Sequence, residues 1–275
     1  MTKFSIIIPA FNEEASIGSL LSVLSGADFL QICEVFVICN GCDDATFEIA
    51  SSFTGLTTSE SAPGKTHALN RGDLLAGNLF PRLYLDADVT ISQDSVLALL
   101  RALDTDVVGV AGPRVEYDFA RRPFIVRRFF RAYETVPGLL HWRLSHMEGR
   151  GVYGVSRTAR ARFGEFPDVR ADDAFFDRQF TYQEKQNVDD ALTIISVPES
   201  MKQLVRSEVR VAAGNRELLS RFPDLKPRPT SNRPKWIATW RDPQLVNLAI
   251  WLAVHLWVRC LVVLRSGANR REPWR

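Results

Sequence analysis

The stretch "RLYLDADVTIS" (residues 82–92) ends an apolar run with two aspartates, Asp86 and Asp88, on either side of a small alanine. In an extended chain, residues i and i+2 point to the same side, so both carboxylates can face one point. Paired carboxylates repel each other, and oxygen ligands of this kind suit Mg²⁺ or Mn²⁺. The pattern predicts a strand that ends at a site for a divalent cation and an anionic ligand. The alternative is that the acids only end the strand and cap a helix that begins near Ser92.

Strands and helices alternate on both sides of this stretch. Short β-branched runs predict strands at 4–8, 34–39, 82–88 and 106–113, and helical periodicity predicts helices at 13–26, 45–53, 64–77 and 92–103. This rhythm predicts an α/β fold, with a Rossmann-like, mainly parallel sheet flanked by helices. Ligands bind at the carboxyl ends of strands in such sheets. Three polar clusters that follow strands are therefore expected to converge on one edge: "IPAFNEE", "ICNGCDD" and "LDAD".

Composition excludes several other classes of protein. The chain has 275 residues and a formal net charge of +2, which gives it no general attraction to nucleic acid. The first residues lack the pattern of a signal peptide, so we expect a cytoplasmic protein. Cys39 and Cys42 form a C-x-x-C without further ligands at zinc-site spacing, and we interpret them as reduced thiols in a turn.

Residues 245–264 form a hydrophobic helix that is long enough to span a bilayer. Asn247, His255 and Arg259 interrupt it and fall within about a third of the helix circumference. Positive charge on both sides favours an amphipathic helix in the plane of a membrane over a clean crossing, and it equally fits a helix that packs on another subunit. A peripheral position at the inner face of the membrane, and a homo-oligomer through this helix, are both expectations.

Residues 114–150 mix arginine with aromatic residues and predict a cap over the site or a second membrane-surface segment.

Four pieces in this order resemble the nucleotide-binding half of a family 2 glycosyltransferase: "FSIIIPAFNEEASI", "VFVICNGCDDAT", "GKTHALNRG" and "LYLDADVTIS". The resemblance covers roughly residues 3–210. It implies the GT-A fold, a nucleotide-activated sugar as donor and inversion at the anomeric carbon. The expected division is a nucleotide-sugar-binding half at 1–112, an acceptor-binding and catalytic half at 113–225, a linker at 226–244, the hydrophobic helix at 245–264 and a basic tail at 265–275.

The resemblance also implies roles for residues near the donor. Glu13 would contact the ribose, and Lys65 would approach the diphosphate or organise the acidic loop. Asn40 stands where the family usually has an aspartate that reads uracil, so UDP is the expected nucleotide and GDP stays open. Asp88 would coordinate Mn²⁺ or Mg²⁺ and Asp86 would face ribose and metal, with the cation assisting diphosphate departure. The implied nucleotide contacts are Pro9, Ala10, Asn12, Glu13, Asn40, Lys65, Asp86, Arg206 and Arg210.

The general base is implied by "VRADDAFFDRQF" (169–180), where the family usually has Glu-Asp. Asp173 is the expected base and Asp172 the second choice. Such proton abstraction is worth about 10² to 10⁴ in rate. The helix dipole alone also favours acids at a helix start, and this is the alternative explanation of the pair.

The acceptor side is implied by "GVYGVSRTAR" (151–160), which resembles the family's glycine-led acceptor strand. Gly151 and Arg157 are the expected acceptor contacts. Arg206 and Arg210 are four residues apart and share one helix face, which either closes over the diphosphate or is a solvated basic face.

These features predict an inverting glycosyltransferase that moves a single sugar to a hydroxyl of a glycan or lipid-linked acceptor. A single hydrophobic helix is too few for a polymer-exporting channel. One alternative is a sugar-phosphate nucleotidyltransferase, although the glycine- and arginine-rich first loop of that class is missing. The other is a catalytically idle nucleotide-binding or scaffold domain.

Overall fold

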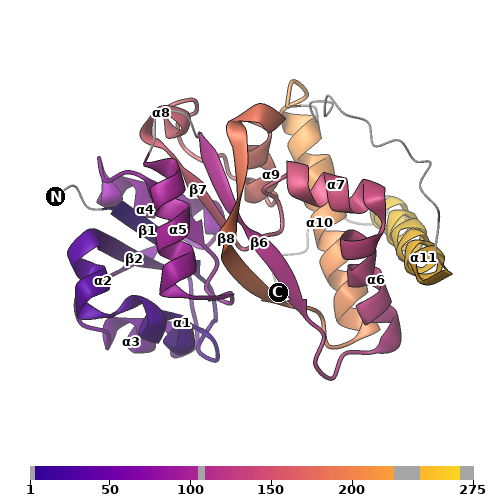
Figure 1. Ribbon diagram of the computed structural model, residues 1–275, viewed down its shortest axis with the longest axis horizontal. Helices are drawn as coiled ribbons and strands as arrows, with labels where there is room; N and C mark the ends of the chain where they lie inside the picture. Colours follow the sequence, from indigo (N-terminus) through magenta and orange to yellow (C-terminus); the bar gives the residue numbers. More distant parts are fainter. Residues whose placement is uncertain (1–3, 105–108, 226–241, 267–275) are drawn as a thin grey trace. The chain divides into compact units, whose positions relative to one another are not determined.

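The computed structural model (Figure 1) describes residues 4–104, 109–225 and 242–266. Its contacts divide the chain into two compact units: unit 1, Met1–Glu116 with His146–Ile195, and unit 2, Tyr117–Ser145 with Ser196–Arg275. The functional boundaries expected at residues 112 and 225 concern ligand roles and stay predictions. Most of the predicted linker and of the basic tail lies outside the described residues.

An eight-stranded sheet runs through unit 1 in the order β3-β2-β1-β4-β7-β6-β8-β5. The parallel arrangement predicted from the sequence is confirmed for the first four strands of this order. The other observed pairs are antiparallel, β4 with β7, β6 with β7, and β5 with β8, so the sheet is mixed. The strands are β1 Phe4–Ala10, β2 Cys33–Asn40, β3 Thr57–Ser61, β4 Arg82–Leu85, β5 Thr90–Ile91, β6 Val110–Asp118, β7 Val152–Val155 and β8 Lys185–Ser196.

The helices of unit 1 follow the predicted rhythm with one difference. The helix expected at 13–26 is α1, which spans only Ile17–Leu24, and the sequence did not predict the short helix α2, which follows the extended backbone of Gly26. Ser92 caps α5 by accepting a hydrogen bond from the backbone N–H of Ser95, so the aspartates before it do not serve as the cap. The helices are α1 Ile17–Leu24, α2 Ala27–Ile32, α3 Thr46–Ser51, α4 Lys65–Ala76, α5 Gln93–Leu103, α8 Arg157–Arg160 and α9 Asp172–Asp177, with a 3₁₀ turn at Tyr182–Glu184.

Unit 2 contains four helices among its described residues: α6 Phe124–Thr135, α7 Pro137–Ser145, α10 Met201–Arg221 and α11 Asp242–Ser266. The predicted hydrophobic helix lies within α11. Phe129 of α6, Leu204 of α10 and Val254 of α11 belong to one buried cluster that joins these three helices. The expected cap segment at 114–150 therefore contributes its helices to a separate core.

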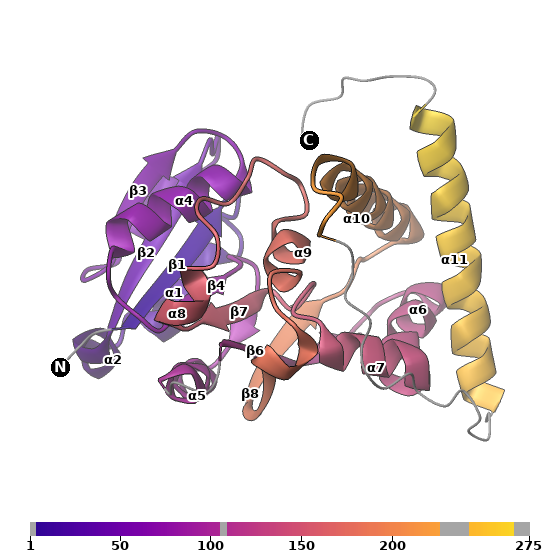
Figure 2. The same ribbon diagram turned by 90° about the horizontal axis from the view of Figure 1, so that it is seen from above.

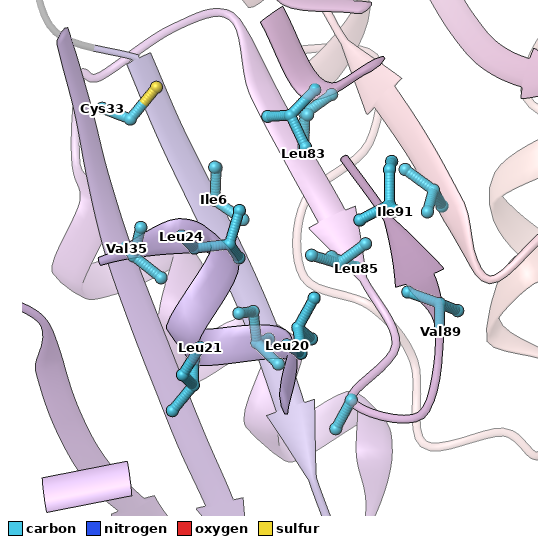
Figure 3. Packing of buried hydrophobic residues seen from close by; sticks show 14 of the residues in the cluster. Ile6, Leu20, Leu21, Leu24, Cys33, Val35, Leu83, Leu85, Val89 and Ile91 are labelled. Atoms are coloured by element: carbon cyan, nitrogen blue, oxygen red, sulfur yellow. The ribbon is translucent and has the colours of Figure 1, made fainter. Parts of the chain in front are cut away.

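One face of the unit 1 sheet carries the main core. Alternate strand residues such as Ile6, Val35 and Leu83 point to this face, as the two-residue period of a strand requires. Leu20 and Leu24 of α1 pack against them (Figure 3). Complete burial of each such side chain is worth about 1.5–3 kcal/mol. This core holds the strand ends that precede the polar loops in fixed positions.

Helix α4 covers the opposite face. Figure 2 shows α4 on one side of β1 and β2, with α2 and α5 on the other side. The approach is close at Gly72, where a Cβ atom would lie 2.4 Å from Cγ2 of Ile7. Only glycine lets the helix backbone come this near to β1, and this contact positions Lys65 at the helix start.

Gly72→Ala is expected to destabilise the protein. Overpacking against Ile7 costs about 1–3 kcal/mol, and the better helix propensity of alanine returns about 1 kcal/mol. We expect a net loss of up to about 2 kcal/mol in the free energy of unfolding, measured by urea denaturation. Gly164→Ala is the control, because no atom lies within 4 Å of a Cβ there. Equal stability of the two variants would contradict the close contact.

Candidate active site

The acidic residues that follow β4 lie in a tight turn. The predicted strand at 82–88 ends at Leu85, and the N–H of Val89 donates to the carbonyl of Asp86 at 3.4 Å. The same-side argument for an extended chain is therefore wrong for Asp86 and Asp88. The turn is anchored instead by the N–H of Asp86, which donates to the carbonyl of Gly151 at 2.8 Å. Asp86 is partly exposed and Asp88 is exposed.

Lys65 joins two acidic segments that are far apart in the sequence. Its Nζ lies 2.8 Å from Oδ1 of Asp86 and 3.1 Å from Oδ2 of Asp172. The two carboxylate oxygens are thus at most about 6 Å apart. The predicted metal loop and the predicted base helix therefore meet around one ammonium group at the first residue of α4.

The charges of this group shift one another's pKa. Burial raises the pKa of Asp172 to about 6, with Lys65 acting in the opposite direction and the carboxylates of Asp173 and Asp86 adding to the rise. Burial would lower the pKa of Lys65, but Asp172, Asp86 and Asp173 raise it above its usual range. Lys65 is therefore a fixed positive charge, while Asp172 titrates in the range where enzymes work.

Glu13 belongs to the same acidic group. Burial raises its pKa, the hydroxyl of Ser16 opposes the rise, and the charges of Asp88, Asp86 and Asp44 add to it. The Ser16 hydroxyl donates to Oε2 of Glu13 at 2.6 Å. The residue after β1 that was predicted to contact the ribose thus lies near the residues after β4 that were predicted to hold the metal.

Asp173 differs from its neighbour Asp172 in its surroundings. Asp172 is 5% exposed, whereas Asp173 is only partly buried. Oδ2 of Asp173 accepts from the N–H of Gly149 at 2.9 Å, and its Oδ1 accepts from the N–H of Ala174 at 2.8 Å. Two backbone donors orient the carboxylate of Asp173, while Asp172 is committed to Lys65.

Gly151 lies beside the acidic turn. Its φ is +68°, and a Cβ there would lie 2.3 Å from Cγ1 of Val89 and 3.8 Å from Oδ2 of Asp86. Both the backbone angle and the contact require glycine. Its expected contact with the acceptor stays a prediction, but its place next to Asp86 is part of the site.

Asn40 is buried, with only 4% of its surface exposed. Its Nδ2 donates to the carbonyl of Ala10 at 2.7 Å, and its Oδ1 accepts from the N–H of Gly64 at 3.3 Å. The side chain thus ties the end of β1 to the start of α4. Pro9 and Ala10 are buried at the end of β1. The roles of all three with the nucleotide stay predictions.

Asn12 holds the loop after β2. Its Oδ1 accepts from the N–H of Asp43 at 2.9 Å, and its Nδ2 donates to Oδ1 of the same aspartate. The N–H of Glu14 donates to Oδ2 of Asp44 at 3.1 Å. Two predicted polar clusters, after β1 and after β2, are therefore cross-linked, as the convergence on one edge required.

Arg157 lies away from the acidic turn, and its expected contact with the acceptor stays a prediction. Because β7 runs antiparallel to β4, Leu85 pairs with Val152 and Arg82 pairs with Val155, so the chain leaves the site as it passes from Gly151 to Arg157. The Arg157 guanidinium donates to both oxygens of Asn78, which precedes β4.

The other predicted arginines are placed as follows. Arg206 and Arg210 are exposed on α10 in unit 2, and their contact with the diphosphate stays a prediction. Arg160, at the end of the same motif as Arg157, places its Nη2 2.6 Å from Oδ2 of Asp73, and its Nε donates to the Tyr84 hydroxyl. That buried network supports the sheet face next to α4.

Two residues near the site escape a search by motif. Tyr153 is buried, and its hydroxyl makes no hydrogen bond with any residue that the structure describes. Burial, with the charges of Asp172, Tyr84 and Asp86 adding to it, raises its pKa well above the usual value. Burial and the charges of Asp173 and Asp177 raise the pKa of Glu148 to about 8. Both come from strand pairing and burial, which leave no linear signature.

A resident metal centre built by protein side chains alone is not present among the described residues, because no group of three or more His, Cys, Asp or Glu side chains is suitably placed. Asp88 and Asp86 supply carboxylate oxygens, which fits a Mg²⁺ or Mn²⁺ ion that takes its other ligands from substrate phosphates and water. Cys39 and Cys42 are free thiols, and burial together with Cys42 raises the pKa of Cys39 to about 12.

The family of the chain follows from a comparison of its sequence with known families. The sequence model of glycosyl transferase family 2 matches residues 5–165, which is more than half of the chain. The chain belongs to glycosyl transferase family 2. It is therefore a glycosyltransferase, and the polar edge of its sheet is the candidate active site of that enzyme. No curated protein matches the sequence of this glycosyltransferase significantly.

Solved structures of similar fold agree with this assignment. A mannosyltransferase from Pyrobaculum calidifontis in complex with GDP-Man and Mn²⁺ is 17% identical, with a TM-score of 0.61, and the match covers 98% of this chain and 76% of that one. Glucosyl-3-phosphoglycerate synthase from Mycobacterium tuberculosis, in complex with Mn²⁺, UDP and glucosyl-3-phosphoglycerate, is 21% identical, with a TM-score of 0.56 and 80% of each chain covered. At these identities the likeness shows the fold, which is of the GT-A type.

Lys65→Met is expected to raise the pKa of Asp172 above 6, because Lys65 is the group that lowers it. A carboxyl whose pKa is raised from 3.8 favours the folded state below about pH 4, and this contribution is lost as the pH rises through its folded pKa. In the variant, the free energy of unfolding keeps falling up to a higher pH than in the wild type. The additional fall is about 1.4 kcal/mol for each further unit by which the pKa of Asp172 rises. Urea denaturation at several pH values measures it.

The matched control for this experiment is Lys202→Met, since Lys202 is exposed on α10. Its stability curve against pH is expected to run parallel to that of the wild type. A parallel curve for Lys65→Met as well would show that Lys65 does not control the charge of Asp172.

Proposed function

We propose that the protein transfers a single sugar, with inversion, from a nucleotide-diphospho-sugar to an acceptor hydroxyl. A UDP-sugar is the donor that we propose, with Asp173 as the general base and a divalent cation on Asp88. In this step the acceptor oxygen bonds to the anomeric carbon and its proton passes to Asp173. The bond from that carbon to the diphosphate breaks, and the nucleoside diphosphate leaves.

The observation that carries this proposal is the contact of Lys65 with both Asp86 and Asp172. Asp86 lies two residues from Asp88, proposed for the cation, and Asp172 is next to Asp173, proposed as the base, so the two proposed functions lie on the two sides of one ammonium group. An inverting transfer needs these two functions close together, since the base acts on the hydroxyl while the cation neutralises the departing diphosphate. A scaffold that only binds nucleotide has no need of the second pair of acids.

The choice of Asp173 over Asp172 is supported by their surroundings. Asp172 is buried and paired with Lys65, so a substrate hydroxyl has poor access to it. Asp173 is partly exposed and its carboxylate is oriented by Gly149. We assign Asp172 the task of holding Lys65, which leaves Asp173 as the proton acceptor.

The cation, Mn²⁺ or Mg²⁺, would be held by Asp88 with Asp86 and would supply Lewis-acid stabilisation of the leaving diphosphate. The similar structures from Pyrobaculum calidifontis and Mycobacterium tuberculosis contain Mn²⁺, with GDP-Man in the first and UDP in the second. Those two nucleotides leave GDP as the alternative to UDP. We propose a glycan or lipid-linked acceptor and action in the cytoplasm at the inner face of the membrane.

Asp173→Asn is expected to lower kcat by about 10² to 10⁴, the usual contribution of a general base. Donor binding is expected to stay within a few-fold, because the nucleotide contacts are untouched. Nucleotide release from a panel of UDP- and GDP-sugars, with calorimetry for binding, measures both. Asp190→Asn, an exposed position on β8, is the control and is expected to keep full activity. A normal kcat in Asp173→Asn would remove this residue from the mechanism.

Asp88→Asn is expected to raise the Mn²⁺ concentration needed for half-maximal turnover by at least about tenfold, since each ligand contributes strongly to a site with few protein ligands. Chelation of divalent ions should abolish turnover in the wild type, and added Mn²⁺ should restore it. Activity that persists in excess chelator would argue against a metal-dependent reaction, even if the transfer itself is confirmed.

A further inference from the structure

Two of the three residues of the polar stripe of α11, Asn247 and His255, face the inside of unit 2, whereas Arg259 is exposed. Asn247 is 1% exposed, and its Nδ2 donates to the hydroxyl of Thr135 at 3.0 Å. The guanidinium of Arg128 donates to Oδ1 of Asn247 at 3.4 Å. Both partners lie on α6. The stripe that the sequence left open to water, lipid or another subunit therefore faces a neighbouring helix of the same chain.

The second residue of the stripe, His255, has partners on two helices. Its ring stacks on Phe129 of α6 with centroids 5.4 Å apart, and its Nε2 lies 3.8 Å from Oε2 of Glu208 on α10. Val254 and Val258 on the same side belong to the core of unit 2. From Asn247 to Val258, about 16 Å of helix at 1.5 Å per residue, α11 is attached to α6 and α10.

The opposite side of α11, which we name the outer face, is apolar and exposed. At 100° per residue its large side chains fall within a sector of about 140°. Their exposed fractions run from 44% to 71%. Between Leu245 and Leu264 no charged residue lies within the sector, and exposed Arg259 lies just outside it. An apolar strip of this length is unusual on the surface of a monomer and marks a contact surface. The outer face consists of Leu245, Val246, Leu252, Leu256, Trp257, Val263 and Leu264.

The two units carry opposite charge, which the net value of +2 conceals. Unit 2 has 21 Lys and Arg against 8 Asp and Glu, a net +13, while unit 1 has 13 against 24, a net −11. A strongly basic unit with an exposed apolar strip matches an anionic phospholipid surface, which offers headgroup charge and hydrocarbon together. The charge complementarity identifies the partner more closely than the apolar strip alone.

Because α11 is attached to α6 and α10, the structure also indicates whether α11 lies on a membrane or crosses it. The structure contains one helix, Gln244–Leu264, that is long and apolar enough to cross. A crossing would carry α6 and α10 with it, including exposed Arg127 and Arg131 on α6 and Arg206 on α10. Each charge in the hydrocarbon costs at least about 2.5–3.5 kcal/mol. The helix can meet lipid through its outer face only if it lies in the plane of the surface.

We propose that unit 2 binds the surface of an anionic phospholipid bilayer, with α11 in the plane of the interface and its outer face about 5–10 Å deep. The inference deepens the membrane location given under the proposed function, and its test does not depend on the transfer reaction. Basic residues supply long-range attraction to the headgroups, and the outer face supplies apolar burial. Binding should therefore need anionic lipid and weaken as salt rises.

The test is co-flotation of the full-length protein with vesicles of phosphatidylcholine alone or with 30% phosphatidylglycerol. We expect binding to the anionic vesicles that is at least about tenfold tighter and that falls at high salt. The double variant Leu256→Glu with Trp257→Glu should lose binding by at least about tenfold. The control is Leu74→Glu, which changes a leucine that is 71% exposed on α4 of unit 1 and should bind as the wild type does.

Several results would overturn the proposal. One is the absence of binding to either vesicle, and another is equal binding by the double variant. A stable dimer in solution that the double variant abolishes, without vesicle binding by the wild type, would assign the outer face to a second copy of the chain. Bound protein that resists alkaline carbonate extraction would show a crossing helix in place of an in-plane one.

Depth of insertion gives a second, independent readout. Trp257 lies on the outer face, 52% exposed, whereas the Trp251 ring stacks on His255. Lipids brominated near the headgroup should quench the Trp257 fluorescence more than lipids brominated near the chain end. Trp257→Phe should remove most of that quenching and Trp251→Phe should not. The reverse pattern would contradict the proposed orientation.

Discussion

The ammonium group of Lys65 between Asp86 and Asp172 is the interaction on which the candidate active site depends. Without it, two carboxylates at most about 6 Å apart would repel each other at the edge of the sheet. Lys65 reaches both because α4 begins at this residue and because Gly72 lets α4 lie against β1. Helix packing, strand order and charge balance are thus linked in one contact. Asp88 and Asp173, next to the paired acids, are the more exposed carboxylates on the two sides.

Much of unit 1 could be predicted from its sequence, because β1, β2 and β4 are apolar runs followed by polar loops. Strand β8 could not, since only Val188, Ala191 and Thr193 of its twelve residues are buried and its first half reads as a polar loop. Strand β7 is antiparallel to β4 because of the path that the preceding chain takes, and no short sequence pattern within β7 indicates this direction. That one reversal separates Gly151, beside Asp86, from Arg157, which contacts Asn78.

Asp86 and Asp88 were predicted from their spacing, and Asp172 and Asp173 from the resemblance to the family, but the partners of these acids were not predicted. A motif names Asp172 and Asp173 together, and only burial shows that one pairs with Lys65 while the other stays accessible. Tyr153 and Glu148 come into the site through strand pairing and the segment that precedes it. The polar stripe of α11 is a similar case: its spacing indicates that Asn247 and His255 need partners, because buried polar groups must be satisfied. Spacing alone does not say that these partners lie on α6 and α10.

The opposite charges of the two units bear on how the enzyme can hold its donor. A nucleoside diphosphate that approaches unit 1, with its net −11, meets like charge, and Lys65 is already engaged by two carboxylates. Positive charge for the diphosphate must therefore come from outside this acidic group. Under the proposed function, a divalent cation held by Asp88 would supply two positive charges to the diphosphate. The charge of the residues themselves therefore agrees with the proposal that the donor binds together with a divalent cation.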